Sequence, residues 1–306
     1  MLSVVIATYN SARTIEYTLS SIVSNRFPRD LFEVLVVDDG SADNTLELAE
    51  NFPVDVYPCT HLGHGSARNL GIKKAKGDII CLTDADIIVP DTWLKKIWDY
   101  FDRHSDVDAI GGPILPPSDD YYESNVQKLT AEIYYEDQVF PTEDMRIQTF
   151  EWKTYLASAN SAYRREALTS VGGFPESQVI KTNDMYVMWS LVEKGRTLVF
   201  LPELKVSHLG FPTTLSGIFR QQFGWGKGKA ITTRAYNYRH PRKISCTKEE
   251  LRKELYPPYA LTKALVQIPL RSPRDKQMLR CCHLAFYYLG LLYGRGFKVE
   301  SSVGGK

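Results

Sequence analysis

Short apolar runs alternate with stretches of helical periodicity along the first hundred residues of the chain. The apolar runs, which predict strands, cover residues 3–8, 33–37, 54–57 and 78–83. The stretches between and after them, which predict helices, cover residues 11–24, 43–50, 66–75 and 93–101. Such alternation is typical of an α/β fold with a mostly parallel central sheet flanked by helices.

A proline-rich segment at residues 113–118 is the clearest interruption of this pattern. We expect a catalytic domain at residues 1–215, with a nucleotide-binding half at about 1–113 and an acceptor half at about 114–215. Residues 121–140 are acidic and rich in tyrosine. We expect this stretch to form a helix that covers the mouth of the site.

Charge is divided unevenly along the 306 residues, although the net charge is only +1. Residues 1–219 hold 19 Lys/Arg and 31 Asp/Glu, whereas residues 220–306 hold 18 and 5. This division indicates an anionic partner for the C-terminal part, either a lipid surface or an acidic substrate, or else packing of that part on the acidic body of the chain. We expect residues 216–306 to form a basic, aromatic, helical extension that binds no nucleic acid, because it carries no zinc-finger or helix-turn-helix pattern.

The composition is that of an ordinary globular protein. The hydrophobic fraction is 43%, and the chain is long enough to bury a full core. The five cysteines lack Cys-x-x-Cys spacing, which argues against a disulfide framework or a zinc site and favours a reducing compartment. The predicted strand begins directly at residues 2–7, without the basic leader and long apolar segment of a signal peptide, so we expect a cytoplasmic location.

One apolar and aromatic segment, residues 281–294, lies between Arg280 and Arg295. A helix of this length reaches about 21 Å, short of the roughly 30 Å core of a bilayer. A helix that lies in the membrane interface, with its arginines toward the headgroups, fits this length better. The alternatives are a core helix that closes the domain and a contact with a second subunit.

Candidate chemistry begins with Asp84 and Asp86, which follow the predicted strand at residues 78–83. The carboxyl ends of strands form the crevice in which open α/β sheets bind their ligands. Two carboxylates this close repel each other unless a cation or hydrogen bonds hold them. Oxygen ligands favour a hard ion such as Mg²⁺ or Mn²⁺, which shares its shell with phosphates. The pattern therefore indicates a metal-bound nucleotide diphosphate.

Two more polar sets follow predicted strands. Asp38 and Asp39 come after a strand, where a carboxylate can accept a hydrogen bond from a base N–H, while Ser41 can cap the next helix. Residues 63–69 place small residues and Arg68 at a predicted helix start, in a pattern that is neither Gly-x-Gly-x-x-Gly nor a Walker loop. Arg68 either organises the carboxylates or a bound nucleotide, or it is a solvated side chain.

Together these motifs resemble the family 2 glycosyltransferases of GT-A fold, over residues 2 to about 210. The shared elements, in the family's order and at its approximate spacings, are Val5-Ile6-Ala7-Thr8-Tyr9-Asn10, Val37-Asp38-Asp39-Gly40-Ser41, Ala67-Arg68-Asn69, Asp84-Ala85-Asp86, Val171-Gly172-Gly173-Phe174 and Asn183-Asp184. The resemblance implies an inverting enzyme that transfers a sugar from a nucleotide diphosphate donor.

The resemblance also implies a role for each motif residue. The nucleoside pocket would be lined by Thr8, Asn10, Asp38, Asp39 and Arg68. Asp84 would lie near the ribose, and Asp86 would ligate a divalent metal ion, Mn²⁺ or Mg²⁺.

Asp184 occupies the position of the family's catalytic base, preceded by Asn183 where the family usually has Glu. An inverting transfer needs a carboxylate that takes a proton from the acceptor hydroxyl, so Asp184 favours a hydroxyl acceptor. The alternative is a charge at the N-terminus of a helix over residues 185–191. His208, after the strand-like residues 205–207, is either a metal ligand, as in some GT-A relatives, or an ordinary hydrogen-bonded histidine.

Residues 221–225 resemble the Gln-x-x-Arg-Trp motif of processive synthases, except that Gly224 takes the place of the arginine. This departure argues against a polysaccharide synthase. Trp225 either stacks on a sugar or anchors the tail helix. Gly224, Gly226 and Gly228 predict a flexible loop that closes over the donor.

We therefore expect a metal-dependent hexosyltransferase that uses a UDP-sugar or GDP-mannose. The acceptor would be a lipid-linked saccharide on the cytoplasmic membrane face, which residues 220–306 would contact. The alternatives are a non-catalytic sugar-nucleotide-binding relative, which Asn183 supports, and a nucleotidyltransferase. Residues 9–13 lack the glycine-rich, lysine-bearing phosphate loop that a nucleotidyltransferase usually carries.

Overall fold

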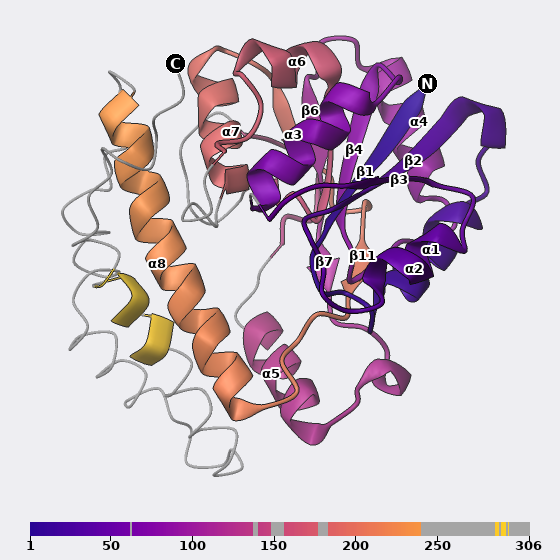
Figure 1. The fold of residues 1–306 in the computed structure, drawn as a ribbon. Coiled ribbons are helices and arrows are strands. Elements are labelled where there is room, and N and C mark those ends of the chain that lie inside the picture. Colours follow the sequence, from indigo (N-terminus) through magenta and orange to yellow (C-terminus); the bar gives the residue numbers. More distant parts are fainter. Residues whose placement is uncertain are drawn as a thin grey trace. The chain divides into compact units, whose positions relative to one another are not determined.

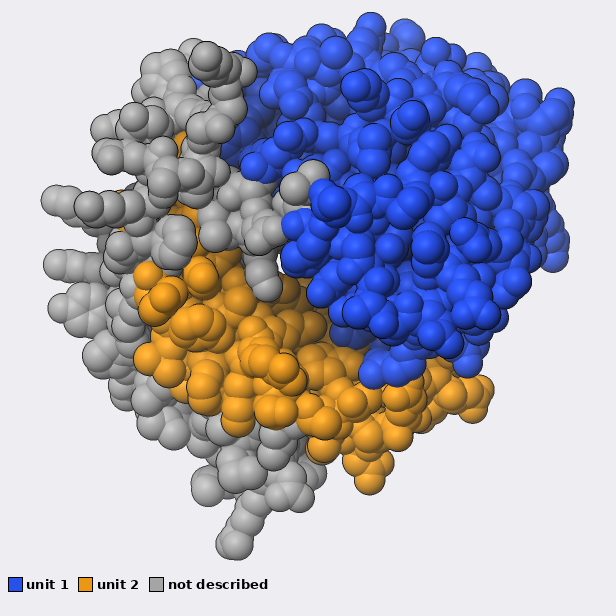
Figure 2. All heavy atoms as spheres, viewed as in Figure 1, with its two compact units in different colours: residues 1–117, 139–178, 183–210 blue, residues 118–138, 179–182, 211–306 orange. Residues whose placement is uncertain are grey.

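The chain divides into two compact units, coloured blue and orange in Figure 2. The computed structural model describes residues 1–61, 63–136, 140–147, 156–176, 183–239, 285–287, 289–291 and 293. Unit 1 comprises residues 1–117, 139–178 and 183–210, and unit 2 comprises residues 118–138, 179–182 and 211–306.

Unit 1 is built on a mixed sheet, in which the described residues form eight strands in the order β3-β2-β1-β4-β9-β6-β10-β8. The strands are β1 (Leu2–Thr8), β2 (Phe32–Asp38), β3 (Asp55–Pro58), β4 (Ile79–Asp84), β6 (Ala109–Gly111), β8 (Met145–Ile147), β9 (Asn160–Arg164) and β10 (Leu198–Phe200). The first four are mutually parallel, whereas β9 is antiparallel to β4 and β6, and β8 to β10. The predicted α/β fold with a mostly parallel sheet is confirmed.

Helices cover both faces of this sheet, as Figure 1 shows for α3 on one side and α1 on the other. The helices of unit 1 are α1 (Ile15–Val23), η1 (Arg29–Leu31, a 3₁₀ turn), α2 (Thr45–Glu50), α3 (His64–Lys74), α4 (Trp93–Arg103), α6 (Arg165–Ser170) and α7 (Asn183–Glu193). Val4 and Ile6 belong to the core that α1 and α4 share, whereas Ala7 packs with Ala67 of α3. Because successive side chains of a strand point to opposite faces, every residue of β1 is buried.

The first helix begins four residues later than its periodicity predicts, at Ile15 rather than Ser11. The backbone N–H of Ser11 donates to Thr45 Oγ1 at 2.7 Å, and that of Ala12 donates to Asp43 Oδ2 at 3.2 Å. Thr45 is the first residue of α2, so these bonds tie residues 11–12 to the start of that helix. Residues 12–14 form a turn in which the N–H groups of Thr14 and Ile15 donate to the carbonyl oxygen of Ser11, and the regular helix begins after it.

A second, smaller sheet of unit 1 joins three short strands in the order β5-β11-β7. They are β5 (Ile87–Ile88), β11 (Val206–His208) and β7 (Ile114–Leu115). β11 runs antiparallel to β5, with His208 opposite Ile87. This pairing carries a residue from late in the chain to the end of β4.

Unit 2 contains helices α5 (Asn125–Glu136) and α8 (Leu215–Arg239), the 3₁₀ turn η2 (Asp119–Tyr121), and a helical segment at residues 285–287, 289–291 and 293. The predicted helix at 121–140 is observed in its central part, and residues 137–139 lie outside the described residues. Trp225 lies in α8 with its ring 5.5 Å from that of Tyr134 on α5, as expected for an aromatic anchor. In the described part of the chain, we find no helix both long and apolar enough to span a bilayer.

The predicted glycine loop is wrong, because Gly224, Gly226 and Gly228 all lie inside the continuous helix α8. A Cβ on Gly226 would lie 1.9 Å from the carbonyl oxygen of Tyr287, and one on Gly290 would lie 2.1 Å from that of Phe223. At least one of these glycines therefore serves close helix packing rather than flexibility. Glycine is tolerated in the helix because the close contact offsets its unfavourable helix propensity.

Candidate active site

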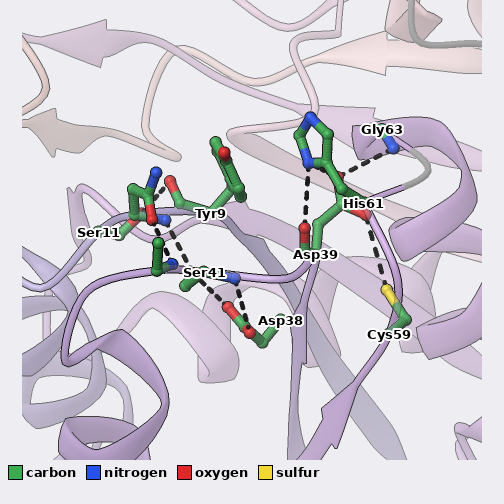
Figure 3. Close-up of polar contacts among 10 residues, drawn as sticks. Tyr9, Ser11, Asp38, Asp39, Ser41, Cys59, His61 and Gly63 are labelled. Atoms are coloured by element: carbon green, nitrogen blue, oxygen red, sulfur yellow. Dashed lines mark hydrogen bonds and ion pairs between the residues drawn. The ribbon is translucent and has the colours of Figure 1, made fainter.

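The ends of β1 and β2 bring three of the predicted pocket residues together. Thr8 pairs in register with Asp38, and both are almost completely buried. The carboxylate of Asp38 accepts hydrogen bonds from the backbone N–H of Ser41, at 3.0 Å, and from its hydroxyl. Asn10, at a left-handed φ of 52°, accepts the N–H of Ala42 on Oδ1 at 2.8 Å. These bonds tie the turn that follows β2 to the end of β1, and Figure 3 shows those between Ser41 and Asp38.

Asp39 is 2% exposed and forms the centre of a second cluster. Its Oδ2 accepts the N–H of Gly63 at 2.9 Å and lies 3.3 Å from Nδ1 of His61, as Figure 3 shows. The thiol of Cys59 lies 3.7 Å from Oδ1. Burial and the nearby Asp39 carboxylate raise the pKa of Cys59 to about 11, so the thiol stays protonated and can donate.

An aromatic pair lies beside this carboxylate, and the sequence analysis did not identify it. The rings of Tyr9 and His61 are 4.4 Å apart, and Tyr9 is 39% exposed. An exposed ring next to a buried carboxylate offers a stacking surface and a hydrogen-bond acceptor, which are the two features that a nucleobase needs. The position of Tyr9 between Thr8 and Asn10 was the available signal.

Arg68, in the first turns of α3, joins three parts of unit 1. Its Nη2 donates to Asp84 Oδ1 and its Nη1 donates to Asn183 Oδ1, each at 2.8 Å. The guanidinium also lies over the ring of Phe174, 5.5 Å from its centroid. With 5% of its surface exposed, Arg68 is part of the carboxylate cluster and not a solvated side chain.

Asp84 and Asp86 turn toward different partners. Asp84 pairs with Arg68, whereas Asp86 Oδ2 lies 3.2 Å from Nε2 of His208. Burial alone would raise the pKa of Asp86, but the adjacent His208 ring lowers it below its ordinary value. Asp86 in turn raises the pKa of His208, against the opposite effect of burial. Gly210 completes the arrangement, because a Cβ there would lie 1.8 Å from Asp86 Oδ2.

The second oxygen of Asp86 suits a cation. Oδ1 is buried and has no hydrogen-bond partner, which is costly unless something positive lies against it. Carboxylate oxygen and imidazole nitrogen are both ligands that Mn²⁺ accepts. No set of three His, Cys, Asp or Glu side chains converges among the residues that the structure describes. Asp86 and His208 are two such ligands, so a metal held by them would take its remaining ligands from phosphate and water.

Asp184 lies in the first turn of α7. Its Oδ1 accepts the N–H of Met185 at 2.9 Å, and its Oδ2 accepts that of Ser158 at 3.4 Å. Burial raises the pKa of Asp184 above its ordinary value, although the charge of Arg68 and the two N–H groups act against the rise. A carboxylate with a raised pKa is a better proton acceptor than a solvated one.

Asn183, directly before Asp184, is 1% exposed. Its side-chain oxygen accepts a hydrogen bond from the Arg68 guanidinium but carries no charge. The negative charge hydrogen-bonded to that guanidinium is the carboxylate of Asp84. A Glu in this place would add a second negative charge. With the neutral Asn183 in this place, part of the positive charge of Arg68 stays available to Asp184 or to a ligand.

Known proteins are similar in sequence to the part of the chain that contains this site. The model of the family described as glycosyl transferase family 2 matches residues 3–172. Glycosyltransferase AglE from Haloferax volcanii is 28% identical over 233 residues, which are 74% of this chain and 72% of AglE. Poly(ribitol-phosphate) β-N-acetylglucosaminyltransferase TarS from Staphylococcus aureus is 37% identical over 112 residues, only 34% of this chain and 20% of TarS.

Solved structures share the fold over nearly the whole chain. A mannosyltransferase from Pyrobaculum calidifontis, in complex with GDP-Man and Mn²⁺, superposes with a TM-score of 0.63 at 20% identity, covering 96% of this chain and 86% of that one. Residues 1–349 of TarS in complex with UDP-GlcNAc superpose with a TM-score of 0.52 at 19% identity, covering 95% and 90%. At these identities the likeness shows the GT-A fold.

Proposed function

Because the chain belongs to glycosyl transferase family 2 and is a glycosyltransferase, we propose that it moves a hexose from a nucleotide diphosphate sugar to a hydroxyl acceptor. The transfer would invert the configuration at the anomeric carbon and would require a divalent metal ion. The observation that carries the proposal is the unpartnered, buried Oδ1 of Asp86 beside His208, at the carboxyl end of β4. The Asp184 carboxylate on α7 supplies the second group that the reaction needs.

The nucleoside of the donor would bind at the ends of β1 and β2. Asp39 would accept an N–H of the base, with Tyr9 as the stacking surface. Both a UDP-sugar and GDP-mannose present an N–H to such a carboxylate. Complexes of the structural relatives with GDP-Man and with UDP-GlcNAc support either donor.

Asp86 and His208 would hold Mn²⁺ or Mg²⁺ on the free oxygen of Asp86 and on the imidazole. The bound ion would neutralise the leaving diphosphate. Arg68 would contribute a fixed positive charge near this site, because its guanidinium pairs with Asp84, two residues before Asp86. The complex of a structural relative with Mn²⁺ supports this choice of ion.

Asp184 would take the proton of the acceptor hydroxyl as that oxygen attacks the anomeric carbon. The two backbone N–H bonds fix the orientation of its carboxylate. Its place in the first turn of α7 also suits the helix dipole, so the helix-charge interpretation and the catalytic one are compatible.

The acceptor would be a saccharide carried on a lipid at the cytoplasmic face of the membrane. The support is the basic composition of residues 220–306, with 18 Lys/Arg against 5 Asp/Glu. A hydroxyl acceptor agrees with the presence of the Asp184 carboxylate, since an ionised phosphate acceptor would need no base.

Donor turnover tests the proposal. Hydrolysis of UDP- and GDP-sugars would be measured with Mn²⁺, with Mg²⁺ and with EDTA, together with thermal-shift binding of the same donors. We expect one donor class to stabilise the protein only when metal is present, and turnover to fall with Asp184→Asn while donor binding persists. Undiminished turnover in EDTA would contradict the role of the metal. Equal turnover by Asp184→Asn would contradict the assignment of the base.

A further inference from the structure

The helical segment formed by residues 285–287, 289–291 and 293 packs on α8 along one of its sides. The ring of Phe286 stacks on that of Phe219 with centroids 4.1 Å apart. The ring of Tyr293 lies 5.6 Å from that of Phe223, and the two backbones approach closely at Gly290. These contacts give the segment a defined inner side.

Next to this packed side, the segment keeps two large apolar side chains exposed. Leu289 is 51% exposed and Tyr293 is 57% exposed. The two side chains are four residues apart, and Ala285 precedes them by four, so all three lie on one face of the helix. An exposed apolar stripe of this kind marks a site of interaction.

Positive side chains recur along one face of α8, and one of them contacts this stripe. Arg220, Lys227 and Arg234 recur every seven residues and so share one face of that helix. Lys227 Nζ lies 5.2 Å from the centroid of the Tyr293 ring, which joins the basic face to the apolar stripe. Arg220 and Arg234 are exposed. Residues 220–306 carry 18 Lys/Arg and 5 Asp/Glu, so their charge complements an anionic surface.

We propose that this face of unit 2, formed by Leu289, Tyr293, Arg220, Lys227 and Arg234, binds the surface of an anionic lipid bilayer. Leu289 would enter the acyl boundary, the amphipathic ring of Tyr293 would lie at the interface, and the basic groups would contact the headgroups. The inference deepens the membrane part of the proposed function and does not depend on the donor chemistry.

Vesicle co-sedimentation of the full chain tests the surface. Vesicles of phosphatidylcholine with an equal share of phosphatidylglycerol would be compared with pure phosphatidylcholine, at low and high salt. We expect binding to the anionic vesicles that weakens as salt rises. The paired substitution Leu289→Gln and Tyr293→Gln should weaken it at least roughly tenfold, because the buried apolar area is lost. The control Tyr17→Gln, at a tyrosine of unit 1 that is 53% exposed, should leave it unchanged.

A second pair separates the charge from the apolar contact. Arg220→Gln with Arg234→Gln should weaken binding to anionic vesicles roughly 25-fold at low salt, and binding to neutral vesicles hardly at all. Donor hydrolysis without vesicles should stay at the parent rate in all these variants, so its loss would concern the proposed function and not the surface.

Three results would overturn the inference. The first is parent binding that is no stronger to anionic than to neutral vesicles. The second is unchanged binding by the Leu289→Gln, Tyr293→Gln pair. The third is sedimentation velocity that shows a parent dimer dissociated by this pair without any vesicle binding, because the face would then join two copies of the chain.

Discussion

Replacing Gly210 with alanine should weaken metal binding without disturbing the fold. Gly210 is not among the glycines with left-handed φ, so its backbone accepts alanine. The added Cβ would lie 1.8 Å from Asp86 Oδ2 and 2.7 Å from His208 Nε2. Real contacts of a Cβ stay above about 3.0 Å, so the Asp86 carboxylate must move by more than 1 Å.

Such a movement is large on the scale of metal coordination. Bonds from Mg²⁺ to oxygen are about 2.1 Å long and tolerate little change. Misplacing a ligand through its surroundings typically lowers metal affinity by about 10- to 100-fold. We therefore expect Gly210→Ala to raise the Mn²⁺ concentration for half-maximal donor hydrolysis by that factor, with a smaller effect on the rate at saturating metal.

The assay is a titration of donor hydrolysis with Mn²⁺, accompanied by calorimetric titration of Mn²⁺ in the presence of the nucleoside diphosphate. Gly195→Ala is the control, because a Cβ added at Gly195, whose φ is +71°, would have no atom within 4 Å. It should cost about 1 kcal/mol of stability through backbone strain but leave the Mn²⁺ dependence unchanged. If Gly210→Ala titrates like the parent, Asp86 and His208 do not hold the metal.

Three further substitutions test the remaining contacts. Asp184→Asn should lower transfer by about 10²- to 10⁴-fold. Because the folded-state pKa of Asp184 is raised, its ionisation should lower the stability of the parent as pH rises above the ordinary Asp range. Asp184→Asn should remove that pH-dependent loss of stability, and an unchanged dependence of the melting temperature on pH would contradict the raised pKa. Asn183→Asp, which adds a second carboxylate beside Arg68, should shift the acidic limb of the kcat–pH profile to higher pH, and an unmoved limb would contradict that coupling. Asn160→Leu should cost about 3 kcal/mol in urea unfolding, because the Trp93 indole N–H and the Leu204 carbonyl lose their hydrogen-bond partner and the Pro113 carbonyl keeps only the N–H of Val206. A loss below about 1 kcal/mol would refute this.

The sequence by itself predicted the parallel half of the sheet and the helices around it. Those predictions succeed because apolar periodicity is a local property, and β1 is buried on both faces as its run of apolar residues indicates. The strand-end positions of Asp38 and Asp84 follow directly, since side chains at the carboxyl ends of neighbouring parallel strands lie at one edge. Local patterns failed at Gly226, where the helix continues because Tyr287, distant in sequence, packs against it.

Only the tertiary structure decided which groups meet at the site. His208 reaches Asp86 through the antiparallel pairing of β11 with β5, across more than a hundred residues of chain. Arg68 contacts Asn183 through an equally distant approach of α3 and α7, and the ring of His61, from a different loop, lies tilted against that of Tyr9. No periodicity encodes these pairs, because each depends on how separate elements pack. The sequence determined the kinds of chemical group available, and packing determined which of them share a charge, a proton or a cation.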